Sequence, residues 1–465
     1  MAYLLNLVYL TALLAALPWL LYARLRYGKY REGWPEKLWG RVARRDSRGP
    51  CIWFHAVSVG EVNLLAPLLE RWEKLHPEWE CVISTTTQTG YALAVKRYAP
   101  RRVFYCPFDF TWSVKRVLRR IRPDVLALAE LELWPNLVEL AHERGIKVAV
   151  VNGRLSERSS RGYARVGWLV RRALEKIDLV AVQDQAYAER FLRLGARPNC
   201  VQVTGSVKFD GAQTERNNPQ TRRLAALAGF EDQDFVFIAG STQAPEESLA
   251  LSTFLSLADA HPRLKLVIVP RHPERFKEVA QLIDQTLTSH RMGWRRRSEI
   301  SGSALAGDEP GTAPRVLLVD AVGELGAWWG TADAAFVGGS LGKRGGQNMI
   351  EPAAYGTPTC FGPNTSNFRD VVQLLLAHDA AVVVNNGPAL LAFVERTLKE
   401  PQWGHSLGQR AQALVLEQAG ASDRTIDLLE AMLNSHELQI KRLGTGHQLG
   451  EASARGEAPP RRRTA

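Results

Sequence analysis

The chain has 465 residues, of which 46% are hydrophobic and 23% are charged, and its formal net charge is +11. At about 150 residues per domain, this length indicates two or three domains of ordinary globular composition. The five cysteines lie far apart without a CxxC pair, and the basic charge comes without an RNA-binding motif or zinc finger. These features argue against a disulfide framework, a zinc cluster and a nucleic-acid partner, and they favour an anionic membrane surface or a phosphorylated substrate.

The N-terminal segment 1–23 has no charged side chain and predicts a membrane anchor helix. About 20 helical residues cross a hydrocarbon core of about 30 Å. Basic residues, Arg24 and Arg26 among them, follow the segment rather than precede it, unlike the charges of a cleaved signal peptide. By the positive-inside rule we expect a single-pass protein with its folded domains in the cytoplasm. An interfacial helix or a helix docked on the protein are the alternatives.

Apolar strand-like stretches that alternate with helical patterns follow over residues 35–210. The expected strands are Cys51–His55, Cys81–Thr85, Arg102–Tyr105, Val125–Ala129, Val148–Val151, Leu179–Val182 and Gln202–Thr204. Continuous apolar strands between helices indicate a parallel sheet that is covered on both faces. We therefore expect a first Rossmann-like domain in this region.

A polar stretch, Gly211–Thr221, interrupts this pattern, and a second α/β domain is expected over residues 222–425. Its expected strands are Phe235–Ala239, Leu264–Val269, Val316–Leu318, Ala334–Val337 and Pro358–Cys360. The stretch Met292–Pro314, with three consecutive arginines, predicts a surface excursion. The polar tail 437–465 predicts disorder.

Two open parallel sheets in one chain predict a central cleft between two facing domains. Ligands of such sheets bind beyond the carboxyl ends of the strands. Functional residues should therefore lie in the loops that lead from strands into helices, and the unusual residues of this chain do so.

The glycine-rich stretch Gly338–Gly346 is the strongest of these loops. Gly345 and Gly346 would let backbone N–H groups approach an anion without obstruction by a Cβ atom. A helix expected to start near Gln347 would add the partial positive charge of its N-terminus. A tight strand–helix turn with glycines kept for packing is the alternative.

Asn348 and Glu351 lie just beyond this loop, three residues apart on one expected helix face. A carboxylate at this place can accept two hydrogen bonds from a ribose diol while the loop holds a phosphate. The pattern therefore predicts a nucleotide-binding site in the second domain.

The run Gly338–Pro358 resembles the donor-binding motif of the Kdo transferases, which move 3-deoxy-D-manno-octulosonic acid (Kdo) from its CMP ester onto lipid A precursors. Four more stretches agree with that family: Phe54–Glu61, Glu132–Asn136, Pro270–Phe276 and Gly362–Phe368. The resemblance covers roughly residues 1 to 425. The chain departs from the family at Gln347, where His is expected, and matches it only loosely over Gly240–Glu247.

The resemblance implies a GT-B fold, an inner-membrane location and a role for Glu61 as the catalytic base. Glycosyl transfer needs a base, because the attacking sugar hydroxyl must lose its proton. Glu61 follows Gly60 where an expected strand loop meets a helix. An ordinary acidic residue in a helix's first turn is the alternative.

Arg271 and His272 end an expected strand between two prolines and are candidates for donor binding. Arginine offers a planar fork for a phosphate or carboxylate, and His272 could bond the donor or the leaving phosphate. Gly323 and Glu324 follow another strand and could meet the cytosine edge through backbone groups. A charged surface loop and a plain helix start are the alternatives for these two pairs.

Four residues are candidates for binding the lipid acceptor, which carries two phosphates. They are Thr86, Glu132, Arg154 and Lys208, each just past an expected strand. Thr86 belongs to a hydroxyl-rich turn that could instead cap a helix. Lys208 could instead serve the acidic sugar, and solvated surface positions remain the alternative for the basic residues.

No metal-ligating pattern and no cofactor motif is evident in the sequence. Charge on the leaving nucleotide would then fall to Arg271, Lys343 and Arg344. The expected activity is an inverting, metal-independent transfer of Kdo from CMP-Kdo to a lipid A precursor. The alternatives are a GT-B transferase or epimerase that uses a UDP-sugar, and a non-catalytic membrane adaptor that keeps a nucleotide pocket.

Overall fold

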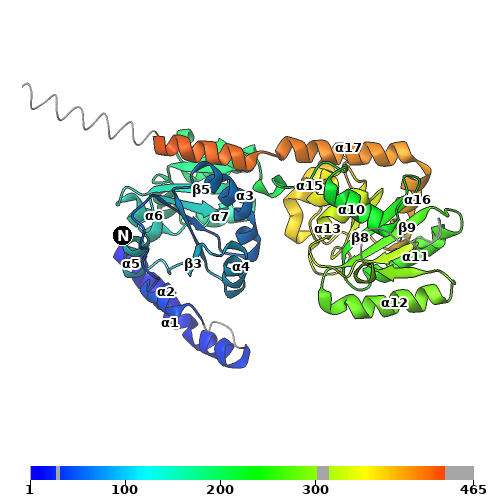
Figure 1. Ribbon diagram of the computed structural model, residues 1–465. Coiled ribbons are helices and arrows are strands. Elements are labelled where there is room, and N and C mark those ends of the chain that lie inside the picture. The colour runs from blue at the N-terminus through cyan, green and yellow to red at the C-terminus, as the bar shows by residue number, and fades with distance from the viewer. Residues whose placement is uncertain (1, 28–31, 301–313, 435–465) are drawn as a thin grey trace, which may run out of the picture. The chain divides into compact units, whose positions relative to one another are not determined.

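The computed structural model describes residues 2–27, 32–300 and 314–434, so the expected tail 437–465 lies outside the described residues. The described chain forms two units. Residues 2–210 and 419–434 make up the first unit, and residues 211–418 make up the second. Each unit contains a parallel sheet flanked by helices, as Figure 1 shows.

The sheet of the first unit has seven strands over the described residues, in the order β3-β2-β1-β4-β5-β6-β7. Its strands are β1 (Cys51–His55), β2 (Glu80–Thr85), β3 (Arg102–Tyr105), β4 (Val125–Ala129), β5 (Lys147–Gly153), β6 (Leu179–Val182) and β7 (Val201–Val203). Every neighbouring pair is parallel. The strands expected from the sequence are confirmed to within one or two residues at their ends.

Helices flank and connect these strands, because parallel strands need crossover connections. They are α1 (Ala2–Tyr27), α2 (Trp34–Trp39), α3 (Val59–Leu75), α4 (Gln88–Tyr98), α5 (Thr111–Ile121), α6 (Pro135–His142), α7 (Glu157–Ala164), α8 (Gly167–Leu174) and α9 (Gln185–Leu194). Helix α5 shows the local reason for this pattern. Val114, Val117, Leu118 and Ile121 lie on one face and are buried, while the arginines between them are more exposed.

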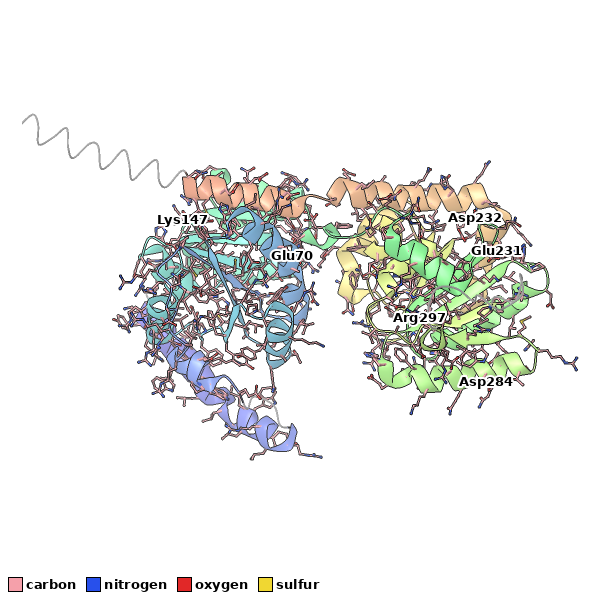
Figure 2. All side chains as sticks on the ribbon, in the orientation of Figure 1. Glu70, Lys147, Glu231, Asp232, Asp284 and Arg297 are labelled. Carbon is pink, nitrogen blue, oxygen red and sulfur yellow. The ribbon has the colours of Figure 1, made fainter. Side chains whose placement is uncertain are left out.

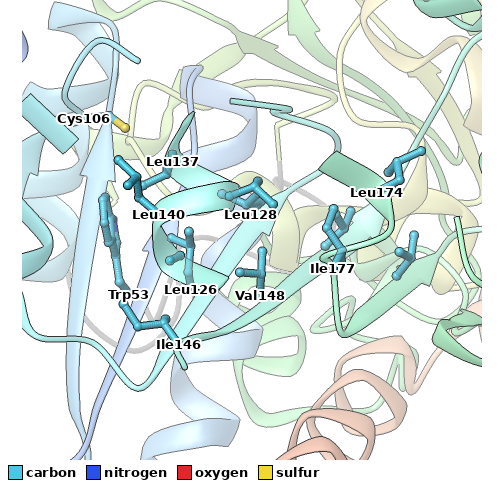
Figure 3. Close-up of a cluster of buried hydrophobic side chains, with 14 of the residues drawn as sticks. Trp53, Cys106, Leu126, Leu128, Leu137, Leu140, Ile146, Val148, Leu174 and Ile177 are labelled. Atoms are coloured by element: carbon cyan, nitrogen blue, oxygen red, sulfur yellow. The ribbon is translucent and has the colours of Figure 1, made fainter. Parts of the chain in front are cut away.

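Successive residues of each central strand face opposite sides of the sheet and enter two separate cores. Trp53 packs into one core with Leu126 and Val148, as Figure 3 shows. Its neighbours Ile52 and Phe54 pack into the other core. A strand that buries both faces needs an uninterrupted apolar run, which is why the sequence predicts these strands well.

The second unit repeats this architecture, with the strand order β10-β11-β9-β8-β12-β13-β14 over the described residues. Its strands are β8 (Phe235–Thr242), β9 (Leu264–Pro270), β10 (Trp294–Arg296), β11 (Val316–Leu318), β12 (Ala334–Val337), β13 (Thr359–Phe361) and β14 (Val382–Val383). Its helices are α10 (Pro219–Ala228), α11 (Glu246–Ala258), α12 (Phe276–Thr288), α13 (Leu325–Trp328), α14 (Ile350–Ala354), α15 (Arg369–Ala377), α16 (Gly387–Lys399) and α17 (Pro401–Gln418). The expectation of two Rossmann-like α/β domains is confirmed.

Both sheets change their direction of winding at one point. In the first unit β1 lies between β2 and β4, and in the second β8 lies between β9 and β12. The loops that leave the two strands of such a switch point diverge to opposite faces and leave a crevice at the carboxyl edge. The loops after β1 and β4, and those after β8 and β12, are therefore the expected ligand-binding loops.

Two sequence expectations about the second unit are wrong in detail. The sequence predicts that the second domain runs to residue 425, but the chain from residue 419 onward belongs to the first unit. Within Met292–Pro314, the expected surface excursion, Trp294–Arg296 forms β10 at the sheet edge, paired with β11. Only three residues pair there. Such a short strand shows no recognisable alternation of polar and apolar residues in the sequence.

Residues 421–434 are helical and pack on the first unit. Ile426 and Leu429 are fully buried in the core formed around Ile52. Asp210 accepts the backbone N–H of Gly420 at 2.7 Å, and the Arg424 side chain donates to the backbone oxygen of Thr204. The C-terminal helix is therefore an integral part of the first unit.

Candidate functional site

The candidate base Glu61 and the four candidate acceptor residues are spread along the carboxyl edge of the first sheet, which we call the acceptor edge. Glu61 follows β1, Thr86 follows β2, Glu132 follows β4, Arg154 follows β5 and Lys208 follows β7. Because the strands are parallel, all five positions come to the same edge. Glu61 and Glu132 leave the two strands of the switch point, so they lie where a ligand crevice is expected.

Glu61 sits in the first turn of α3, which begins at Val59. Ser58 is the N-cap residue, and its Oγ accepts the N–H of Glu61 and donates to its Oε1 at 2.7 Å. Glu61 Oε2 accepts the N–H of Val57 at 2.8 Å. This reciprocal bonding is a variant of the capping box, in which the carboxylate accepts the N–H one residue before the N-cap. The carboxylate is thus held firmly at the loop and stays partly exposed.

Glu132 has a strongly perturbed environment. Burial raises the pKa of its carboxyl group to about 7, and the negative charges of Glu61 and Glu130 contribute to this rise. The charge of Glu61 is thus felt at Glu132, which follows the other strand of the switch point. A carboxyl group whose pKa is raised toward neutrality is typical of sites of acid–base chemistry.

A buried polar group supports the loop that carries Glu61. The Nδ1 of His55 lies 2.8 Å from Ser84 Oγ, which also accepts the Trp53 indole N–H at 2.7 Å. Burial lowers the pKa of His55 to about 4, so its imidazole is neutral at physiological pH. His55 ends β1, and its bond to Ser84 near the end of β2 fixes the two strand ends of the acceptor edge relative to each other.

The remaining acceptor candidates differ in how they are held. Thr86 Oγ1 is buried and has no partner among the described residues, while the neighbouring Thr87 caps α4 by accepting the N–H of Gly90. The helix-cap alternative therefore applies to Thr87 rather than to Thr86. The Oδ1 of Asn152 accepts the N–H of Val207 at 3.0 Å. This bond joins the loop that carries Arg154 to the turn that carries Lys208.

The second unit places the glycine-rich loop Gly338–Gly346, which we call the donor loop, directly after β12. The buried carboxylate of Glu246, at the start of α11, accepts three successive backbone N–H groups of this loop, at distances of 2.7, 3.0 and 3.0 Å. It also accepts the N–H of Gln243 at 2.9 Å. Glu246 therefore ties together the two loops of the switch point.

This arrangement occupies part of the donor-loop backbone. The N–H groups of residues 339–341 bond to Glu246, and the N–H of Gly346 donates to the backbone oxygen of Gly339. The helix that follows, α14, begins at Ile350 rather than near Gln347 and has five residues. The expected helix start is therefore wrong, and the bonded N–H groups hold the shape of the loop. Contact of the Gly345 N–H group with an anion stays a prediction.

Gly345 and Gly346 are needed for that shape. Both have positive φ angles, of 86° and 76°, which favour glycine. A Cβ atom on Gly345 would lie 2.5 Å from Ser366 Oγ, and one on Gly346 would lie 2.9 Å from the Met349 side chain. The packing alternative for these glycines is therefore supported, and their contact with a donor stays a prediction.

Basic side chains gather beside the donor loop. Lys343, Arg344 and His272 line a pocket of about 280 Å³ together with Glu246 and Arg275. Arg275 is paired with the buried carboxylate of Glu247, so its charge is already compensated. The charges of Lys343 and Arg344 are the ones that this pocket offers to an anion.

Asn348 and Glu351 are bonded to each other, as their spacing suggested. Asn348 Nδ2 donates to Glu351 Oε1 at 3.0 Å, and Asn348 Oδ1 accepts the N–H of Ile350. Burial raises the pKa of Glu351, whereas its hydrogen bond with Asn348 and the positive charge of Arg271 lower it. Arg271 and Glu351 are therefore neighbours, although they follow different strands.

Arg271 and His272 lie at the carboxyl end of β9. The N–H of Arg271 donates to the backbone oxygen of Thr242, which fixes the loop against β8, and the Arg271 side chain is exposed. The His272 ring lies 3.9 Å from Glu274 at the surface. Both side chains are accessible to a ligand at the edge of the second sheet.

Gly323 and Glu324 lie in the turn between β11 and α13. The carboxylate of Glu324 accepts two hydrogen bonds of 2.9 Å from Arg297, which Figure 2 labels. Gly323 has a φ angle of 91°, which favours glycine. The Glu324 side chain is thus engaged within the protein, and the expected contact through backbone groups stays a prediction.

Sequence reasoning missed Glu246 as part of this site. The loop Gly240–Glu247 matches the family only loosely, and the sequence alone assigns no role to its acidic residues. Two adjacent acids at the start of a helix, directly after a strand, are the available signal. The donor-loop partners of Glu246 lie 93 to 95 positions away and the partner of Glu247 lies 28 away, so no local pattern identifies them.

Comparisons with known proteins agree with this architecture. Residues 30–211 match a family model described as 3-deoxy-D-manno-octulosonic-acid transferase. The chain is 33% identical to the 3-deoxy-D-manno-octulosonic acid transferase of Haemophilus influenzae, over 87% of this chain and 92% of that protein. It is 34% identical to the transferase of the same name from Bordetella pertussis, over 84% of this chain and 91% of that protein.

Among solved structures, the chain resembles the UDP-GlcNAc 2-epimerase of Neisseria meningitidis bound to UDP-GlcNAc. The TM-score is 0.50, the identity is 13%, and the match covers 79% of this chain and 99% of that chain. At this identity the likeness concerns the fold alone. It agrees with the expected GT-B class of two Rossmann-like domains.

Proposed function

The chain belongs to the family of Kdo transferases and is a glycosyltransferase of lipopolysaccharide biosynthesis, and we propose that it moves Kdo from CMP-Kdo onto a lipid A precursor of the lipid IVA type. The observation that carries this proposal is the pair of carboxyl groups at the switch point of the first sheet together with the exposed cations beside the donor loop of the second. Carboxylates occupy the acceptor edge, at Glu61 and Glu132, whereas exposed cations flank the donor loop. The acceptor hydroxyl group needs a base to take its proton, and the anionic donor needs cations to bind it.

The donor would be held by the second unit. CMP-Kdo carries a phosphate and a sugar carboxylate, and Arg271, Lys343 and Arg344 supply charges for both. Glu351 is placed to accept hydrogen bonds from the ribose hydroxyls, because Asn348 orients its carboxylate. His272 and the backbone of Gly323 and Glu324 complete the set of donor contacts that we propose.

The reaction would be a single displacement. An acceptor hydroxyl attacks the anomeric carbon of Kdo while Glu61 takes the hydroxyl proton. The bond from the anomeric carbon to the phosphate oxygen breaks, and its electron pair leaves with CMP. The attack from the opposite face inverts the anomeric centre. Arg271 and Lys343 stabilise the charge that develops on the leaving phosphate, without a metal ion.

The acceptor would be held by the first unit. The bond between Asn152 and Val207 joins the segments that carry Arg154 and Lys208. These two basic residues would bind phosphate groups of the acceptor. The unpartnered hydroxyl of Thr86 can bond a sugar hydroxyl. The raised pKa of Glu132 suits a carboxyl group that exchanges a proton near neutral pH.

We propose that the enzyme works at the cytoplasmic face of the inner membrane, where the acyl chains of the acceptor are embedded. In the described part of the chain, α1 is the one helix long and apolar enough to cross a membrane. The single-pass topology expected from the sequence stays a prediction, because length and composition do not distinguish a spanning helix from one in the interface.

One assay tests the proposed reaction. The purified protein is incubated with labelled CMP-Kdo and tetraacylated lipid A precursor, and the mass of the product lipid is measured by mass spectrometry. We expect the lipid to gain the mass of Kdo residues as CMP is released. Label that stays with the nucleotide would contradict the proposal. The melting temperature of the protein is then measured with CMP and with UDP. We expect a larger rise with CMP, whereas an enzyme that uses a UDP-sugar would be stabilised more by UDP.

A further inference from the structure

The pocket that Lys343, Arg344 and His272 line, which we call the donor pocket, has a neighbour on the same loop. This neighbour, which we call the second cavity, has a volume of about 370 Å³. Lys343 and Gly345 line it, together with residues of the segment Pro363–Arg369, which leads from β13 into α15. Because Lys343 lines both the donor pocket and the second cavity, the two share one cation.

Hydrogen bonds hold the segment after β13 against the donor loop. Asn364 donates its N–H to the backbone oxygen of Ser340 at 2.9 Å. Asn367 donates its N–H to the backbone oxygen of Gly345 and its Nδ2–H to that of Arg344, both at 2.9 Å. The walls of the second cavity are therefore fixed before a ligand binds, which lowers the entropy cost of binding.

Several polar groups of the second cavity are without a partner among the described residues. The side chains of Lys343 and Arg369 are exposed and form no ion pair there. The hydroxyl groups of Thr365 and Ser366 form no hydrogen bond within the described chain, and the N–H of Gly345 has no acceptor in it. A Cβ atom on Gly345 would lie 2.5 Å from Ser366 Oγ, so the last two groups are neighbours. These groups are available to a ligand.

The second cavity is also cationic. Over the described residues, no acidic side chain lines it. In the donor pocket, by contrast, the carboxylate of Glu246 is present, and Arg275 is paired with Glu247. The charges of Lys343 and Arg369 are thus not compensated at the second cavity. A ligand with an anionic group and hydroxyl groups complements it.

The chemistry of the donor matches this pair of cavities, a point that rests on the proposed function. The anomeric carbon of Kdo carries the sugar carboxylate and, in CMP-Kdo, also the phosphate ester. One oxygen and one carbon atom separate the phosphorus from the carboxyl carbon, so the two anions must be bound side by side. Two cavities that share Lys343 meet this requirement. A nucleotide ester of a neutral sugar has no second anion at this place.

We propose that the second cavity binds the carboxylate and hydroxyl groups of the donor sugar, and that Arg369 determines the specificity for an acidic sugar. The guanidinium of Arg369 offers parallel N–H groups that suit the two oxygens of a carboxylate. Lys343 serves both anions, and the hydroxyl groups of Thr365 and Ser366 bond those of the sugar. The donor pocket, with Arg344, then holds the phosphate.

Two ligands that differ by the sugar alone test this assignment. CMP and CMP-Kdo are each titrated into the purified full chain in a calorimeter, without acceptor, for the wild type and for Arg369→Gln. We expect the wild type to bind CMP-Kdo more tightly than CMP. Arg369→Gln should weaken the binding of CMP-Kdo about tenfold or more and leave that of CMP unchanged. Arg369→Lys keeps the charge and should restore part of the loss.

Arg223→Gln is the matched control, because Arg223 is another exposed arginine of the second unit, on α10. It should change the binding of neither ligand. Arg369 is exposed as well, so the melting temperatures of all the variants should match that of the wild type.

An equal loss of affinity for CMP and CMP-Kdo in Arg369→Gln would overturn the proposal, because the second cavity would then hold the phosphate. Unchanged binding of both ligands in this variant would overturn it too, as would a wild type that binds CMP-Kdo no more tightly than CMP. The titrations need no transfer. Their failure is therefore distinguishable from a failure of the proposed function, which the mass of the product lipid reports.

Discussion

The carboxylate of Glu246 accepts the backbone N–H of Gly339 at 2.7 Å, and this bond is one of four that Glu246 receives from two loops. The residues are 93 positions apart and follow β8 and β12, the two strands of the switch point in the second sheet. Glu246 is only 1% exposed, so the charge is stabilised by these N–H groups rather than by water.

Replacing Glu246 with Gln should destabilise the second unit. The Gln side chain keeps one oxygen but turns an NH₂ group toward N–H donors, so the two N–H groups on that side lose their acceptor. We expect a loss of about 3 kcal/mol, from about 1.5 kcal/mol for each hydrogen bond to a charged group. Differential scanning calorimetry should show a lower melting temperature. Glu274→Gln, at an exposed position, is the control and should leave it unchanged.

Replacing Gly338 with Ala should disturb the donor loop. A Cβ atom there would lie 2.7 Å from Glu246 Oε2 and 2.7 Å from Thr242 Cα. Overpacking of this kind lowers the free energy of unfolding by about 1–3 kcal/mol. Because the proposed donor contacts lie on this loop, the KM for the donor should also rise. Gly342→Ala lies in the same loop with nothing within 4 Å of the new Cβ atom, so it is the matched control. Equal effects of the two substitutions would contradict the packing argument.

Glu61→Gln should remove turnover while the protein still binds its donor. Loss of a general base reduces a rate by about 10²- to 10⁴-fold. The Gln side chain can still accept the N–H of Val57, so α3 should keep its start. Calorimetric titration with CMP checks donor binding, and the transfer assay checks turnover. Glu70→Gln on the exposed side of α3 is the control, and normal turnover in Glu61→Gln would refute the assignment.

Glu132 should make the stability of the protein depend on pH. Its pKa is raised from an ordinary value of 4.5 to about 7, so the folded state binds the proton more tightly than the unfolded state does. This contribution to stability is present below about pH 4.5 and is lost as the pH rises through 7. Glu132→Gln keeps a neutral side chain at every pH. The melting temperature of the wild type, relative to that of this variant, should therefore fall as the pH is raised from about 5 to about 8.

Asn6→Leu should weaken the docking of α1 on the first unit. The N–H of Thr111 would lose its acceptor in a buried place, at a cost of about 1–3 kcal/mol. Thr11→Leu is the control, because the Thr11 hydroxyl group bonds to Leu7 within the same helix. Thermal unfolding in detergent should show a lower melting temperature for the first variant. An equal melting temperature for both would contradict the docking contact.

The amino-acid sequence by itself determined the strands, the division into two α/β units and the strand-end loops in which the candidate residues lie. Strands that are buried on both faces need uninterrupted apolar runs, so stretches such as Val125–Ala129 are recognisable locally. Parallel strands bring their carboxyl ends to one edge, so Glu61 and Glu132 could be assigned to one site. The motifs also led to the family, because several of them agree at once.

Only the tertiary structure decided what the loops do internally and how α1 is held. Glu246 accepts three N–H groups of the donor loop, to which the sequence gives it no link, and Asn6 bonds to Thr111, 105 positions away. Neither contact leaves a periodic or short-range signal in the chain. Such contacts form because buried polar groups must find partners, and the fold alone determines which partner is within reach.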